Sequence, residues 1–176
     1  LSIYDSVLRV PLILRLPEVI LANRRVPQVV QSIDIAPTIL DLLGIAMPES
    51  FQGQSFSKML LSDHDDDVLA TYAFSERGAT VASVRSNRWR YVFNPEEEAL
   101  GLGRGVESDY SYRIEREELY DLQADPDETI NIIHEHPELG EKLRRLLAEW
   151  REETEVESHR DQEFDQATLD ELRALG

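Results

Sequence analysis

Four short segments contain the side-chain types that could bind a metal, cleave an ester or hold an anion. The first, Asp63–Asp67, reads DHDDD. Alternate carboxylates followed by a glycine turn would bind calcium, with a bidentate Glu at the twelfth position of the loop. Here no Gly follows the run and no Glu stands at the twelfth position. We therefore expect a solvated turn at this segment and no metal site.

The histidines offer a second possibility. His134 and His136 have the spacing that places two side chains on one face of an extended segment. They precede Pro137, and no cluster of Cys or Glu accompanies them, so a surface pair is favoured over a zinc site. His159 lies in an acidic stretch and carries no further signal.

The other two segments concern nucleophiles and anions. Ser75-Glu76-Arg77-Gly78 lacks the G-x-S-x-G pattern of a nucleophile elbow, so Ser75 is not predicted to be catalytic. Arg85, Arg88 and Arg90 surround Trp89 and could form an anion patch. In a hairpin they occupy outward positions, and we expect ordinary surface arginines. The residues thus predict no catalytic group and no metal ligand in this chain.

Composition restricts the possible functions further. The 176 residues carry a net charge of −17, of which −14 falls in Glu107–Gly176. Such an acidic surface repels phosphate backbones, which argues against nucleic-acid binding. The absence of Cys excludes disulfides and thiolate chemistry. No apolar run approaches the length of a membrane-spanning helix. The N-terminus has no signal-peptide pattern, so Leu1 is expected to be a cut rather than a natural start, and the localisation stays open.

The first third of the chain predicts the C-terminal end of an α/β domain. Val10–Arg15 is a short apolar run that is typical of a strand buried on both faces, and Val29–Ile33 is a second one. Asp34 is then expected to cap a helix with Pro37 in its first turn and Gly44 as its left-handed stop. Phe56–Leu61 predicts a short helical turn.

The remainder predicts a small antiparallel sheet covered by a helix. Strands are expected at Val68–Ser75, Ala79–Arg85, Arg88–Phe93 and Glu118–Leu122, with a tight turn at Ser86-Asn87 and a long mobile loop over Pro95–Tyr112. Pro137 opens a helix whose apolar face comprises Leu139, Leu143, Leu146, Leu147 and Trp150. Glu152–Gln166 reads as a solvated helix end or tail, and Ala167–Leu175 as a last short helix. These patterns divide the chain into an α/β part (1–66), a subdomain (67–150) and an acidic tail (151–176).

Several short sequence motifs, which follow one another in the same order, resemble motifs of the sulfatases of the alkaline phosphatase superfamily. Tyr4-Asp5 leads into Arg9-Val10-Pro11, as a Tyr-acid pair leads into an Arg-Val-Pro strand in that family. Asp34-Ile35-Ala36-Pro37-Thr38 resembles its Asp-x-Ala-Pro-Thr helix start, and Gly53-Gln54-Ser55-Phe56 its Gly-x-Ser-Leu element. Glu118–Leu122 reads ELYDL, another family phrase, and Leu172–Gly176 resembles a frequent bacterial ending.

The resemblance implies the C-terminal portion of an alkaline-phosphatase-like α/β domain, followed by an antiparallel sheet and a long helix. It implies a parent enzyme that hydrolyses sulfate esters with calcium and a formylglycine. The Cys/Ser-x-Pro/Ala-x-Arg motif that yields formylglycine is absent here, as are the family's Asp-Asp pair and Asp-His-Gly ligands. This chain alone is therefore expected to be inactive, without a cofactor of its own. A phosphonate or phosphodiester hydrolase of the same superfamily, or a noncatalytic interaction module, remains the alternative.

Two residues are candidates for the wall of the substrate cleft. Arg77 stands beside Gly78 at a strand end and could face an anionic substrate; the alternative is an ordinary surface Arg. Tyr4 would closely follow the family's sulfate-binding Lys, whose position falls at or before Leu1; the alternative is a packing Tyr.

Overall fold

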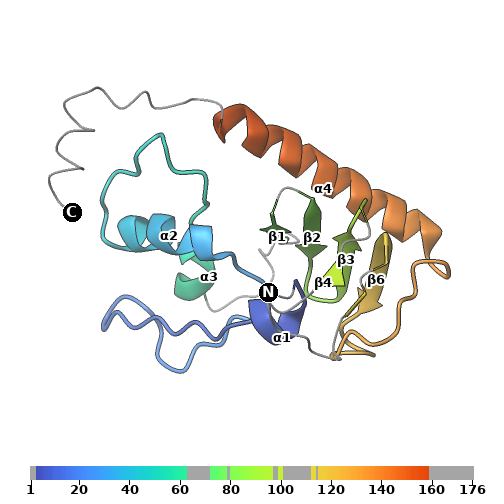
Figure 1. The fold of residues 1–176 in the computed structure, drawn as a ribbon. Helices are drawn as coiled ribbons and strands as arrows, with labels where there is room; N and C mark the ends of the chain where they lie inside the picture. Colours follow the sequence, from blue (N-terminus) through green and yellow to red (C-terminus); the bar gives the residue numbers. More distant parts are fainter. Residues whose placement is uncertain are drawn as a thin grey trace, which may run out of the picture.

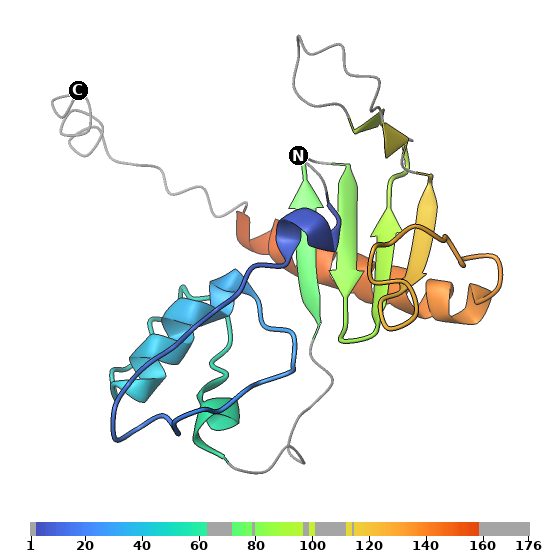
Figure 2. The same ribbon diagram turned by 90° about the horizontal axis from the view of Figure 1, so that it is seen from below.

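The computed structural model describes residues 3–62, 72–78, 80–96, 99–100, 112–113 and 115–158. A four-stranded antiparallel sheet forms its centre, and a long helix runs across one face while the N-terminal segment lies on the other (Figures 1 and 2). The helices are α1 (Asp5–Leu8), the 3₁₀ turn η1 (Ser32–Asp34), α2 (Ile35–Leu42), α3 (Ser57–Leu61) and α4 (Pro137–Ser158). The strands are β1 (Ala73–Arg77), β2 (Val81–Arg85), β3 (Trp89–Phe93), β4 (Ala99–Leu100), β5 (Tyr112–Arg113) and β6 (Glu117–Asp121).

The sheet has the strand order β1-β2-β3-β6, and every pairing is antiparallel. Arg85 pairs with Arg90 across the β2–β3 hairpin, and the N–H of Ser86 donates to the carbonyl of Trp89 at 2.8 Å. The four strands expected for the antiparallel sheet and the tight turn are therefore confirmed within the described residues, although several strand ends differ from those expected and residues 68–71 lie outside the described part.

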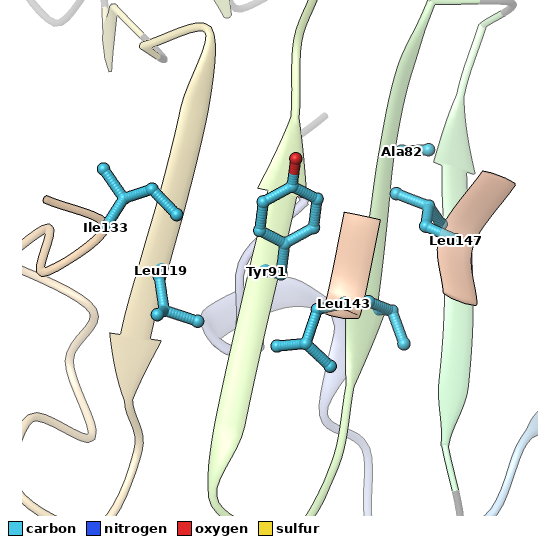
Figure 3. Packing of buried hydrophobic residues seen from close by; sticks show 7 residues of the cluster. Ala82, Tyr91, Leu119, Ile133, Leu143 and Leu147 are labelled. Atoms are coloured by element: carbon cyan, nitrogen blue, oxygen red, sulfur yellow. The ribbon is translucent and has the colours of Figure 1, made fainter. Parts of the chain in front are cut away.

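The main core lies between the sheet and α4. Alternation along the strands turns Ala82, Val84, Tyr91 and Leu119 toward the helix, where Leu143 and Leu147 meet them (Figure 3). Phe74 stacks on Trp150 with ring centroids 4.8 Å apart. The predicted apolar face of the helix and the α/β class, with an antiparallel sheet packed by a long helix, are both confirmed.

The opposite face of the sheet is also covered. Ile3 packs there against Val81 and Val92, and all three are buried. Consequently β2 is buried on both faces, from Val81 to Val84. This second layer places the N-terminal segment against strands that follow it by about eighty residues in the sequence.

The helical unit before the sheet folds largely as its sequence predicts. Gly44 has φ +66°, and the N–H of Ile45 reaches the carbonyl of Leu40 at 2.9 Å, which closes α2 with the expected left-handed stop. Asp34 departs from expectation, since its side chain does not cap α2. Its carboxylate instead accepts the N–H groups of Gln31 and Gln54, because η1 already supplies the turn that leads into α2.

The two strands expected in the first third of the chain are wrong for this structure. Val10–Arg15 has no regular secondary structure, with Val10 74% and Ile13 88% exposed. Val29–Ile33 runs irregularly into η1, and the N–H of Val29 donates to the side-chain oxygen of Asn87. A strand forms only where another strand supplies ladder hydrogen bonds, and no described strand lies beside either run.

The apolar side chains of this part remain uncovered. Of the fifteen exposed large hydrophobic residues among those described, all except Ile130 lie between Val7 and Leu61. The chain thus combines a sheet–helix unit that has its own core with a preceding segment that has little.

The described residues test the expectations for the loop, the acidic tail and the domain boundaries only in part. Within the expected loop Pro95–Tyr112, β4 pairs with β5 at its two ends. Helix α4 continues past residue 150, to Ser158. The run Asp63–Asp67, His159, the boundary at residues 66–67 and the helix expected at Ala167–Leu175 lie outside the described residues, so the threefold division of the chain stays a prediction. In the part that the structure describes, no helix is long and apolar enough to cross a membrane.

Candidate functional site

The most unusual feature of the molecule is a buried cluster of four charged side chains beneath the N-terminal segment. It comprises Asp5 at the start of α1, Arg85 at the end of β2, Arg90 in β3 and Glu128 in the turn after β6. The side chain of Arg90 is 1% exposed and that of Glu128 2% exposed. Burial of this kind requires pairing, because an unpaired charge in the interior is strongly unfavourable.

Asp5 connects the two arginines. Its carboxylate accepts from Arg85 Nε at 2.9 Å and Arg85 Nη2 at 3.0 Å, and it also accepts from Arg90 Nη2. Arg90 Nη1 donates to the carbonyl of Ile3 at 3.1 Å and to Ser83 Oγ at 3.3 Å. The guanidinium group of Arg90 therefore holds both the backbone and the side chain of the N-terminal segment against the sheet.

Glu128 closes the cluster from the other side. Its Oε1 lies 2.5 Å from Arg90 Nε, and its Oε2 accepts the backbone N–H of Asp5 at 2.6 Å. Glu128 has φ +55°, a backbone conformation that costs a non-glycine residue about 1–2 kcal/mol. The carboxylate of Asp125 fixes this turn, since it accepts the N–H groups of Thr129 and Ile130 at 2.7 and 2.8 Å.

The cluster shifts the pKa values of Asp5 and Glu128 in opposite directions. Burial raises the pKa of Asp5, but the hydrogen bond from Arg85 and the charges of Arg90 and Arg85 outweigh it and leave that pKa below its ordinary value. For Glu128, burial dominates and raises the pKa, although Arg90 and the N–H of Asp5 oppose the shift. The cluster as a whole pairs two cations with two anions and is neutral.

Tyr4 lies in a second layer beside the cluster. Its hydroxyl donates to Glu118 Oε2 at 2.7 Å, and its ring meets Tyr120 edge-on with centroids 6.1 Å apart. The backbone N–H of Glu115 donates to the other oxygen of Glu118 at 2.8 Å. Burial raises the pKa of Glu118, and the hydrogen bond from Tyr4 opposes this. Tyr4 thus packs within this chain, and its assignment to a substrate cleft stays a prediction.

Arg77 lies on the same face of the sheet as Tyr4. It pairs with Val81, which packs against Ile3, and Tyr4 packs on the same group. Arg77 Nη1 is buried and has no hydrogen-bond partner among the described residues. The structure thus places the two predicted wall residues on one face of the sheet, and their role in a substrate cleft stays a prediction.

Sequence patterns did not predict the cluster. The interpretation of Arg90 and Arg85 as outward surface residues is wrong, because the face that carries them is covered by Ile3–Asp5. Only Arg88 is outward, with a 51% exposed side chain that pairs with Asp121 and lies over the ring of Trp89. Val92, two residues after Arg90, was an available signal: an apolar residue on the supposed outer face indicates a second covered face.

The histidines and acids of the described part do not gather into a metal centre. Among these residues, no group of three or more His, Cys, Asp or Glu side chains is placed to hold an ion. His136 lies against the ring of Trp89, with centroids 5.8 Å apart. The acidic run Asp63–Asp67 is outside the described part, so its prediction as a solvated turn stays untested.

Comparison with known proteins identifies the family. Residues 2–102 match the family model described as "N-sulphoglucosamine sulphohydrolase, C-terminal". Arylsulfatase K of Mus musculus is 31% identical over 161 residues, which cover 84% of this chain and 26% of the relative. An ulvan-active sulfatase of Formosa agariphila is 29% identical over 175 residues, covering 84% and 29% respectively.

A solved structure supports the fold. A protein described as a 2-O GAG sulfatase superimposes with a TM-score of 0.50 at 24% identity, over 72% of this chain and 25% of that one. The chain thus spans about a quarter of the length of the curated relatives it matches. From the family model and the curated relatives together, the chain belongs to the sulfatase family and corresponds to the C-terminal region of these enzymes.

Proposed function

We propose that this chain is the noncatalytic C-terminal part of a sulfuric ester hydrolase and that it hydrolyses nothing by itself. It contributes the sheet–helix subdomain and one wall of the substrate cleft, while the nucleophile and the metal lie elsewhere in the parent enzyme. The substrate of that parent is a sulfate ester.

The uncovered apolar surface is the observation that carries this proposal. Fourteen large hydrophobic side chains between Val7 and Leu61 are exposed, yet the sheet–helix unit beside them has a closed core. Exposed apolar surface on this scale marks an interface. Because the matched relatives are about four times as long as the aligned part, the natural occupant of that interface is the remainder of a sulfatase catalytic domain.

Calcium and formylglycine belong to the remainder of the parent in this proposal. The described side chains do not fit calcium, and the sequence does not fit formylglycine. The chain has no Cys and no Ser-x-Pro/Ala-x-Arg motif from which formylglycine could form, and the carboxylates of Asp5 and Asp125 are already held by arginines or backbone N–H groups. We therefore assign no step of the reaction to a side chain of this chain.

Arg77 and Tyr4 remain proposed wall residues in the parent enzyme. Arg77 is the better supported, because a buried guanidinium nitrogen without a partner has hydrogen-bonding capacity left for an anion. Tyr4 already donates its hydroxyl to Glu118, so its contribution would be to position the chain that precedes it. Both lie on the face of the sheet that the N-terminal segment covers.

Reconstitution tests the proposal. Purified chain is assayed with nitrophenyl sulfate, with and without calcium, alone and then after co-expression with the upstream part of the parent reading frame. We expect no turnover alone and turnover of the sulfate ester after reconstitution. Turnover by the isolated chain that a substitution within residues 1–176 abolishes would overturn the proposal.

The same assay separates the alternatives. A reconstituted enzyme that cleaves a nitrophenyl phosphonate or phosphodiester but not the sulfate would make the parent a different hydrolase of the superfamily. An upstream reading frame without a formylglycine motif would favour a noncatalytic interaction module. In the reconstituted enzyme, Arg77→Ala should lower kcat/KM while the melting temperature stays nearly unchanged, because the buried Nη1 of Arg77 makes no hydrogen bond among the described residues that the substitution would remove.

A further inference from the structure

A small polar cavity opens beside the buried charge cluster, at the end of the sheet that carries the β2–β3 turn. Its volume is about 230 Å³, and it is lined by Asp5, Arg9, Pro27, Arg85, Asn87, Leu122 and Pro126. Arg85 and the wall candidate Arg77 stand at opposite ends of the β1–β2 ladder, since Arg77 pairs with Val81. Four residues of strand separate the two ends by about 13 Å, so the cavity is distinct from the Arg77 position.

Unused hydrogen-bond donors dominate this cavity. Arg9 is exposed, and its guanidinium meets no partner among the described residues. Asn87 accepts the N–H of Val29 with its side-chain oxygen at 2.9 Å, which leaves both hydrogens of its amide nitrogen available. Arg85 uses Nε and Nη2 for Asp5 and Nη1 for the carbonyl of Ser86, and each terminal nitrogen retains one hydrogen.

Acceptors are scarce in the same space. Among the described residues of the lining, Asp5 is the only acidic one, and its two oxygens already accept from Arg85 and Arg90. Pro27, Leu122 and Pro126 add rigid walls without side-chain donors or acceptors. The described part of the lining therefore carries two cations and one anion, and that anion is already paired with arginines, in a chain whose net charge is −17.

We propose that this cavity binds a small oxyanion, with Arg9, Arg85 and Asn87 as its donors. Its volume lies below the roughly 300–1,000 Å³ of sites that enclose a drug-sized ligand, so it suits a small sulfate-bearing ligand rather than an oligosaccharide. The sulfate can be a free inorganic ion or one carried by a sugar. This inference does not depend on the proposed function, because it concerns binding by this chain and not turnover.

Asn87 offers the sharpest perturbation. Asn87→Asp keeps the oxygen that accepts from Val29 but replaces the amide donor with a negatively charged acceptor. Asn23→Asp is its matched control, since Asn23 is exposed, lies outside the lining and undergoes the same change of charge. For Arg9→Ala the control is Arg15→Ala, another exposed arginine that is not part of the cavity.

The measurement is a nitrogen–proton NMR titration of the full chain with sodium sulfate, in which sodium chloride keeps the ionic strength constant. We expect saturable shifts at the Arg85 side chain and at the amides of Arg9 and Asn87. Arg9→Ala should weaken binding at least about tenfold, which is the loss of one charge-assisted hydrogen bond. Asn87→Asp should abolish binding, and both controls should stay within about twofold of the unaltered chain.

A sulfated monosaccharide and its unsulfated form then distinguish the source of the anion. Tighter binding of the sulfated sugar than of inorganic sulfate identifies a sugar-borne sulfate, and equal binding identifies the free ion. Arg9→Gln serves as a second variant if Arg9→Ala disturbs the fold, which the dispersion of the NMR spectrum reports. Linear, non-saturating shifts, or equal losses in Arg9→Ala and Arg15→Ala, would refute the site.

Discussion

Replacing Asp5 with asparagine should release the N-terminal segment from the sheet. The carboxylate of Asp5 receives hydrogen bonds from both Arg85 and Arg90, and the neutral amide of asparagine can accept from only one side. Arg90 is 1% exposed and would keep only Glu128 as a charged partner. The substitution therefore creates a buried guanidinium that is only half compensated.

The size of the effect follows from that burial. Breaking a buried ion pair by removing one partner costs about 3–5 kcal/mol, because the remaining charge stays desolvated. The substituted side chain retains one acceptor oxygen, and the segment can open to hydrate Arg90, so we expect the lower end, about 3 kcal/mol. A loss of this size lowers the protection of the segment's amides against exchange about a hundredfold, since 1.4 kcal/mol corresponds to a factor of ten.

Hydrogen exchange followed residue by residue is the direct assay. The informative amides are those of Asp5, which donates to Glu128 Oε2, and of Leu8 and Arg9, which close α1 on Tyr4 and Asp5. Glu76→Gln is the matched control, because Glu76 is a more exposed acid that pairs with Arg151 near the far end of α4. Surface pairs of this kind contribute about 0–1 kcal/mol.

The pH dependence provides a second check. The pKa of Asp5 is lowered in the folded chain, so its contribution to stability is complete above the unfolded pKa of about 3.9 and is lost as the pH falls through the folded pKa. The stability difference between the unaltered chain and Asp5→Asn should be constant above about pH 5 and shrink at more acidic pH. If Asp5→Asn costs no more than Glu76→Gln, or the difference does not shrink in acid, the assignment of the cluster as a clamp is wrong.

Three further predictions address the two layers and a backbone contact. Leu147→Ala should destabilise the chain by about 2–5 kcal/mol in urea unfolding, because Leu147 is buried between α4 and the sheet, whereas Leu61→Ala, at an exposed site, should stay within about 0.5 kcal/mol. Gly53→Ala should cost about 1–3 kcal/mol or more, since an added Cβ would collide with the backbone carbonyl of Ile33; an unchanged urea midpoint would contradict the close approach. Tyr4→Phe should lower the free energy of unfolding by about 1.5–3 kcal/mol at neutral pH, because it removes the hydrogen bond to the Glu118 carboxylate. The loss should become smaller as the pH falls, because Glu118, whose pKa is raised, takes up a proton. Tyr72→Phe is the control, and a loss independent of pH would exclude the role of the Tyr4–Glu118 hydrogen bond.

Local signals in the sequence determined the elements that need no distant partner. The stop at Gly44 depends on one residue's left-handed backbone, and the face Leu143–Leu147–Trp150 depends on the spacing of a single helix. The hairpin around Asn87 and the alternation of Trp89, Tyr91 and Phe93 are likewise short-range patterns. Family phrases such as Tyr4-Asp5 and Glu118–Leu122 identified the sulfatase resemblance, which the comparisons confirmed.

Only the tertiary structure showed that the two strands expected before residue 34 do not form and that a buried charge cluster exists. Val10–Arg15 has the composition of a strand, but a strand requires a neighbour's backbone, and no described strand supplies one. Arg90 has the alternation of a surface residue, yet its environment is set by Asp5, which lies 85 positions earlier, and by Glu128, which lies 38 positions later. Periodicity reports which side chains share a face, whereas only the folded chain determines what covers that face, and here this difference converts an expected surface arginine into the centre of a buried clamp.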